Sequence, residues 1–171
     1  MALIYPPSCD PTAPYLAVPM LTGFLRSRGA TVLPIDANID AYDALLSPGS
    51  LRRLRDRIEA RIADLDAQKS LSHVDQLIYS TLQQARGDAH AVPTRIVAAK
   101  ATLRHPTRFY DPDAYGRAVA TIDAALRVVS AAYAPLNLDF TAYRTPFSLT
   151  SPDEIAHDAQ PDHDPFDPYT E

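Results

Sequence analysis

The first 38 residues constrain the fold of this chain most, because two short apolar segments flank a proline-rich loop and a helix-like segment. Residues 2–5 are apolar and are followed by two prolines, which cannot donate hydrogen bonds within a sheet, so they predict a short buried strand. Residues 31–35 predict a second strand, with residues 36–38 as its exit. A strand, a helix and a strand within about forty residues are typical of a parallel βαβ unit.

The segment between the two strands has the periodicity of a helix. Pro19 is compatible with this helix only in its first turn, and Gly29, after Arg26 and Arg28, predicts its end. Apolar side chains recur at spacings of three and four residues and define one helical face, which comprises Leu16, Met20, Leu21, Phe24 and Leu25.

The loop between the first strand and this helix is the best candidate for a binding site. In parallel sheets the carboxyl ends of the strands border the ligand crevice, so residues 6–14 and 36–38 are both expected at that edge. The prolines stiffen the loop and leave it little entropy to lose on binding. Its hydrogen-bonding side chains are those of Ser8, Cys9, Asp10 and Thr12. On this chemistry alone, a binding loop and a rigid structural connector both remain open.

Beyond residue 38 the pattern becomes helical. Ser50 is the expected N-cap of a helix with a narrow apolar stripe. That stripe comprises Leu51, Leu54, Ile58, Ile62 and Leu65. Ser72 and Asp75 resemble a weaker capping box for a second helix, which Gly87 is expected to end. A third helix is expected over residues 93–103.

Asp111 followed by Pro112 is a strong start signal for a further helix. Its expected apolar face comprises Tyr115, Val119, Ile122, Leu126, Val129 and Tyr133. Residues 137–144 alternate enough to predict an extended segment. Ser151 is expected to begin a short helix, which is followed by an acidic, proline-broken tail without Lys or Arg.

This order of elements predicts an α/β fold, an incomplete Rossmann-like βαβ start with a long helical insertion that makes the chain predominantly helical by residue count. The expected parts are a first βαβ unit (1–38), the helical insertion (39–135), and an extended segment with a short helix and an acidic tail (136–171). The length of 171 residues fits a single domain or a little more.

Composition excludes several classes of function. The 16 basic and 21 acidic residues give a formal net charge of −5, which argues against a nucleic-acid-binding surface. No apolar stretch is long enough to span a bilayer and no signal-peptide pattern is present, so a cytoplasmic protein without membrane contact is expected. With 5 glycines, the chain contains neither GxGxxG nor GxxxxGK(S/T), the usual phosphate-binding loops.

Catalytic and metal-binding signals are weak. Cys9 is the only cysteine, and the adjacent Asp10 carboxylate disfavours its thiolate, so Cys9 is expected to be a small loop residue and not a nucleophile. A single thiol cannot supply a structural zinc or iron–sulfur site. The tail gathers His157, Asp158, Asp162, His163 and Asp164. Because their spacing matches no metal-site pattern, an acidic solvated tail is favoured.

Several segments carry a family resemblance. They are residues 2–7 (ALIYPP), 10–17 (DPTAPYLA), 21–29 (LTGFLRSRG), 32–38, 109–112 (FYDP), 124–133, 151–154 (SPDE) and 164–166 (DPF). In this order and spacing they span essentially the whole chain, which resembles the N-terminal region of radical SAM proteins that carry a B12-binding-type domain.

The resemblance implies a Rossmann-like domain, which binds cobalamin in many members, ahead of a partial TIM barrel. In that barrel a CxxxCxxC loop holds a 4Fe–4S cluster, which cleaves S-adenosylmethionine to start methylation or ring-rearrangement chemistry. By resemblance, the opening loop lies at the cofactor-facing edge. The candidate cofactor-binding residues are Pro7, Ser8, Cys9, Asp10, Thr12, Tyr15, Asp36 and Asn38.

Two sequence motifs of the family are missing from this chain, and their absence indicates what partner it is expected to have. CxxxCxxC and the cobalt-ligating DxHxxG pattern are both absent, so the chain by itself is expected to be non-catalytic, with the cluster and S-adenosylmethionine in a barrel that it lacks. The chain stops before a third strand, and two parallel strands make a poor sheet. The expected partner is the remainder of the radical SAM polypeptide or a chain that completes the sheet. The alternative is a stand-alone, non-catalytic binding or protein-interaction module.

Overall fold

The two predicted N-terminal strands form and pair in parallel. The computed structural model describes residues 1–5, 10–12 and 15–144. In it β1 (Ala2–Tyr5) pairs with β2 (Leu33–Asp36), from Ala2 opposite Leu33 to Tyr5 opposite Asp36. The predicted βαβ start is therefore confirmed. The predicted helix at Ser151 and the acidic tail lie outside the described residues.

The helix between these strands, α1 (Ala17–Ser27), also agrees with the prediction. Pro19 lies in its first turn, and Gly29 follows its end with a φ of 81°, a left-handed conformation that suits glycine. Val18 and Thr22 are the buried residues of α1. Most of the predicted apolar face is exposed, however, and comprises Leu16, Met20, Leu21 and Phe24.

The sequence analysis missed a helix that begins directly after β2. Residues 36–38 were expected to be a strand exit, but α2 (Ala37–Leu45) starts at Ala37, so Asn38 lies in its first turn. Asp36 ends the strand and caps this helix, because its Oδ1 accepts a hydrogen bond from the backbone N–H of Ile39 at 3.1 Å. A short polar residue in the N-cap position was the available signal.

Three long helices pack together beyond α2, namely α3 (Pro48–Asp66), α4 (His73–Leu103) and α5 (Pro112–Ala132). The predicted stripe of α3 is confirmed, since Leu51, Leu54, Ile58, Ile62 and Leu65 are all buried. The predicted N-cap is wrong. Ser47 caps α3 by accepting from the backbone N–H of Ser50, and Pro48 occupies the first turn.

A single helix, α4, replaces the two helices expected between residues 72 and 103. The Ser72–Asp75 capping box is confirmed: Ser72 Oγ accepts from the backbone N–H of Asp75 and donates to its carboxylate. Gly87 and Pro93 lie inside the helix, although they disfavour helix by about 1 and 3 kcal/mol respectively. The helix continues because one face stays buried past both residues, through Leu82, Ala85, Ala89, Val92, Ile96 and Ala99.

The predicted start of α5 is confirmed. Asp111 caps it by accepting from the backbone N–H groups of Asp113 and Ala114, each at 3.0 Å, directly after a short 3-10 helix, η1 (Arg108–Tyr110).

The predicted extended segment is a small hairpin, in which β3 (Asn137–Leu138) pairs antiparallel with β4 (Tyr143–Arg144). Ser130 fixes it to α5, since its Oγ both accepts from and donates to the backbone of Leu138.

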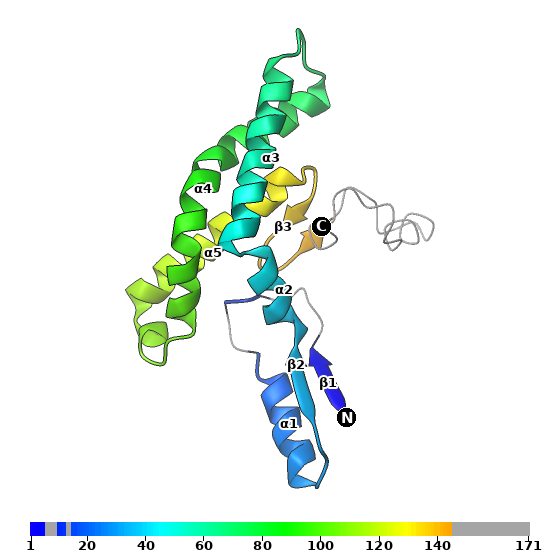
Figure 1. Cartoon of the computed structure of the whole chain (residues 1–171), viewed down its shortest axis with the longest axis vertical. Helices are drawn as coiled ribbons and strands as arrows, with labels where there is room; N and C mark the ends of the chain where they lie inside the picture. The colour runs from blue at the N-terminus through cyan, green and yellow to red at the C-terminus, as the bar shows by residue number, and fades with distance from the viewer. Residues whose placement is uncertain (6–9, 13–14, 145–171) are drawn as a thin grey trace, which may run out of the picture.

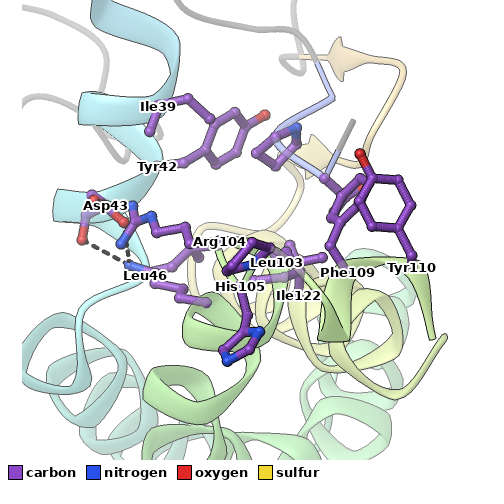
Figure 2. A pocket seen from close by; sticks show the side chains of 14 residues that line it. Ile39, Tyr42, Asp43, Leu46, Leu103, Arg104, His105, Phe109, Tyr110 and Ile122 are labelled. Carbon is purple, nitrogen blue, oxygen red and sulfur yellow. Dashed lines mark hydrogen bonds and ion pairs between the residues drawn. The ribbon is translucent and has the colours of Figure 1, made fainter. Parts of the chain in front are cut away.

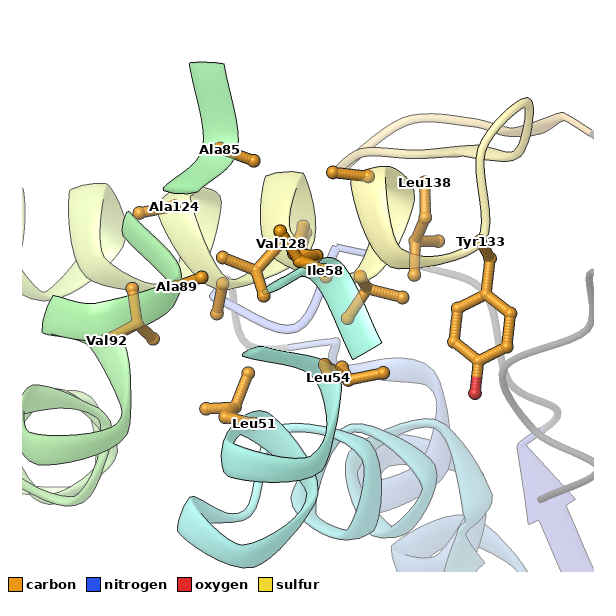
Figure 3. Packing of buried hydrophobic residues seen from close by; sticks show 14 of the residues in the cluster. Leu51, Leu54, Ile58, Ala85, Ala89, Val92, Ala124, Val128, Tyr133 and Leu138 are labelled. Atoms are coloured by element: carbon orange, nitrogen blue, oxygen red, sulfur yellow. The ribbon is translucent and has the colours of Figure 1, made fainter. Parts of the chain in front are cut away.

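Figure 1 shows how the parts are arranged. The β1–α1–β2 unit lies at one end of the molecule and the long helices at the other, with α2 running between them. The carboxyl ends of β1 and β2 point toward the helices. The main hydrophobic core lies among α3, α4 and α5, where residues such as Leu51, Ile58 and Val128 interdigitate (Figure 3).

The chain is therefore mostly helical with a small two-stranded parallel sheet. The broad α/β class and the predominance of helix agree with the prediction. Within the described residues, no helix has the length and apolar character needed to cross a membrane.

Candidate functional site

A pocket of about 430 Å³ lies where the opening loop meets the helices. Pro11 and Thr12 border it from the loop, α2 and the C-terminal end of α4 form two walls, and η1 with its preceding turn forms another. Figure 2 shows side chains from these elements converging on it. The pocket thus lies on the side of the sheet to which the carboxyl ends of β1 and β2 point.

One wall of the pocket is charged. Lys100 Nζ lies 3.0 Å from Asp43 Oδ1 and also donates to the Asp43 backbone carbonyl at 3.1 Å. Arg104 Nη2 donates to Asp43 Oδ2 at 2.5 Å. Partial burial raises the pKa of the Asp43 carboxyl, but hydrogen bonds from Arg104 and Lys100, together with their charges, outweigh it and leave this pKa lowered.

The remaining walls are mainly apolar and aromatic, from α2, α4, η1 and α5. They include Ile39, Tyr42, Leu46, Leu103, Phe109, Tyr110 and Ile122. Phe109 is held edge-to-face between Tyr110 and Tyr115, with ring centroids 5.2 and 5.3 Å away. Tyr110 is 79% exposed, so its ring offers an aromatic face to a molecule entering the pocket.

His105 has a structural role at this site. Its Nδ1 accepts hydrogen bonds from the backbone N–H groups of Thr107 and Arg108, each at 3.2 Å, and so caps the turn into η1. His105 thus holds the turn that leads into η1, one wall of the pocket.

The structure places some of the predicted cofactor-binding residues near the pocket and others away from it. Thr12 is 5% exposed and borders the pocket, and Asp10 holds it by accepting from its backbone N–H at 2.8 Å and its hydroxyl at 2.6 Å. Tyr15 lies elsewhere, stacked on Tyr5 with ring centroids 4.2 Å apart. Asp36 caps α2, and Asn38 is buried in that helix.

Of the eight predicted residues, Thr12 is the one that the described structure places on the pocket. Pro7, Ser8 and Cys9 lie outside the described residues. The sequence analysis missed Tyr42, Asp43, Lys100, Arg104 and Phe109. The Asp43–Lys100 contact joins residues 57 positions apart, and no local pattern in the sequence pairs them.

A complete cobalamin does not fit within the described residues alone. A pocket of about 430 Å³ has the size of a site for one drug-sized ligand, whereas cobalamin, with its corrin ring and nucleotide loop, is much larger. The polar side chains at the sheet edge are also engaged locally, because Asp10 binds Thr12 and Asp36 caps α2. Nor do the described residues contain a group of three or more His, Cys, Asp or Glu that could hold a metal ion.

Comparison with known proteins identifies no relative: no family model, no curated protein and no solved structure matches this chain.

Proposed function

We propose that this chain is the N-terminal, cobalamin-binding-type region of a radical SAM enzyme. The observation that carries the proposal is the parallel pairing of β1 and β2 around α1, with the loop after β1 and the start of α2 leaving from the same sheet edge. In open parallel sheets, ligands bind beyond the carboxyl ends of the strands. The residues quoted for the family resemblance include both of these strand exits.

In this proposal the chain contributes one side of a cofactor site and no catalysis. Its single cysteine cannot hold a 4Fe–4S cluster, so the cluster, S-adenosylmethionine and the methyl-transfer or rearrangement chemistry belong to a barrel outside this chain. Because the described residues alone do not enclose a corrinoid, the rest of its site comes from further strands of the parent protein.

The open sheet supports a partner of that kind. Ala2 pairs with Leu33, so Leu33 and Ile4 lie on the same face of the sheet, and they are 63% and 59% exposed. Parallel sheets are normally covered on both faces and continued by neighbouring strands. The proposed partner is therefore the remainder of the radical SAM polypeptide or a chain that completes the sheet.

Cofactor binding is tested by titrating the full chain with hydroxocobalamin and following the corrin absorbance, with co-migration in gel filtration as a second readout. We expect weak binding that Tyr15→Ala reduces severalfold, because Tyr15 is half exposed beside the sheet edge. Leu77→Ala, at an exposed position on α4, is the matched control. Unchanged absorbance and no co-migration at saturating cofactor would count against a cobalamin role.

The second candidate function is a stand-alone, non-catalytic interaction module. The exposed apolar side chains of the β1–α1–β2 unit favour it, since they suit contact with another protein. The coding sequence discriminates between the two. A reading frame that continues past Glu171 into a further strand and CxxxCxxC supports the enzyme region, whereas a stop codon there supports the module.

A further inference from the structure

The charged wall of the pocket carries more positive than negative charge. Lys100 and Arg104 both pair with the single carboxylate of Asp43. The lowered pKa of Asp43 keeps that carboxylate ionised at neutral pH. These three side chains form the charged cluster of the lining, and His105 beside them accepts two backbone hydrogen bonds through Nδ1. The cluster is therefore left with one net positive charge.

Arg104 has N–H donors that its hydrogen bond to Asp43 does not use. A guanidinium carries five N–H donors in a planar fork, and the hydrogen bond from Arg104 to Asp43 uses Nη2. Its side chain is 56% exposed, whereas that of Lys100 is 17% exposed and donates twice to Asp43. Arg104 can thus pair with a second carboxylate without giving up Asp43, and arginine favours two parallel hydrogen bonds to such a group.

The rest of the pocket suits a flat apolar body. Phe109 and Tyr110 stand at right angles on the side of the pocket opposite Ile39 and Asp43 of α2, as Figure 2 shows. Leu46 and Ile122 add buried apolar lining. The volume of about 430 Å³ is enough for a two-ring molecule within the usual range of ligand pockets. Aromatic walls with one charged anchor are the common design of small-molecule sites.

We propose that this pocket binds a small aromatic carboxylate, with its rings between Tyr42, Leu46 and Phe109 and its carboxylate on Arg104. Thr12 borders both this pocket and the proposed cobalamin surface. The residues that would hold the aromatic carboxylate come from α2, α4 and η1, so this proposal does not depend on cobalamin binding.

The test uses two probes with the same rings and different charge, naphthalene-2-carboxylate and naphthalene-2-carboxamide. Isothermal titration of the full chain at pH 7 is expected to give a dissociation constant about tenfold lower for the carboxylate, as one charge-assisted pair provides. Arg104→Gln is expected to remove this preference and Arg104→Lys to retain part of it. Arg95→Gln, at an exposed position on the same helix, is expected to leave it unchanged.

Two further variants distinguish binding in the pocket from binding elsewhere on the molecule. Leu103→Trp fills the pocket and is expected to abolish binding of both probes, with circular dichroism to confirm that the chain stays folded. Leu21→Ser alters the exposed face of α1 and is expected to change neither affinity. The proposal is overturned if neither probe binds, if both bind the wild type equally, or if the preference survives in Arg104→Gln.

Discussion

The long helices and the N-terminal β1–α1–β2 unit differ in how far their apolar side chains are buried. In the helices one apolar face of each helix packs into a shared core, where Ile58, Val128 and Val129 are fully buried, although Val74 and Leu77 on α4 are exposed. In the N-terminal unit Val18 and Val32 are buried, while Ile4, Met20 and Phe24 are each more than half exposed. The helices thus complete their own core, whereas the sheet unit presents apolar surface that other protein normally covers.

The largest expected effect tests the core of the helices. Leu126 is 1% exposed in α5, so Leu126→Ala should lower the free energy of unfolding by about 2–5 kcal/mol through lost burial and a residual cavity. Urea denaturation measures this loss. Leu77→Ala, 57% exposed on α4, is the control and should be nearly neutral. Equal losses of stability in the two variants would contradict a buried core among the long helices.

A smaller effect is expected at the start of α5. Asp111→Ala removes the acceptor for the backbone N–H groups of Asp113 and Ala114, and should cost about 0.5–2 kcal/mol of stability. Asp111→Asn keeps a capping oxygen and should recover most of that loss. If both variants melt at the same reduced temperature, the cap does not explain the role of Asp111.

The contact between α2 and α4 predicts a dependence on pH. The pKa of Asp43 is lowered in the folded chain, so its charge stabilises the fold above the unfolded pKa of about 3.9. This contribution is lost as the pH falls through the lower folded pKa. Because the pair is partly exposed, Asp43→Asn should cost at most about 1 kcal/mol at pH 7, and the difference from wild type should vanish near pH 2.

Asp40→Asn is the matched control for that experiment, since Asp40 is exposed on the same helix. An Asp43→Asn deficit of the same size at both ends of the pH range would show that its charge is not responsible.

The smallest effect is expected on the exposed face of α1. Leu21 is 49% exposed, so Leu21→Ser should change the stability of this chain by less than about 0.5 kcal/mol. A loss above about 2 kcal/mol, measured by the same denaturation, would mean that this face is buried in solution.

The sequence predicts the elements better than it predicts the site. Local signals are enough for the stripe of α3 and for the cap at Asp111, because each depends on neighbouring residues. They fail at Gly87 and Pro93, where long-range packing of α4 outweighs local helix preference. They also fail for the pocket, because Asp43 and Arg104 meet only after α2 and α4 have packed. Pro11 and Thr12 of the proline-rich loop border the pocket, yet most of the residues that line it come from the helices.

Native-state hydrogen exchange in increasing urea tests the contrast between the two regions most directly. We expect amides in the buried parts of α3, α4 and α5 to exchange only with global unfolding, and those of α1, β1 and β2 to open at a distinctly lower free energy. Exchange of both regions at the same free energy would contradict the account, since the sheet unit would then be as self-sufficient as the helices.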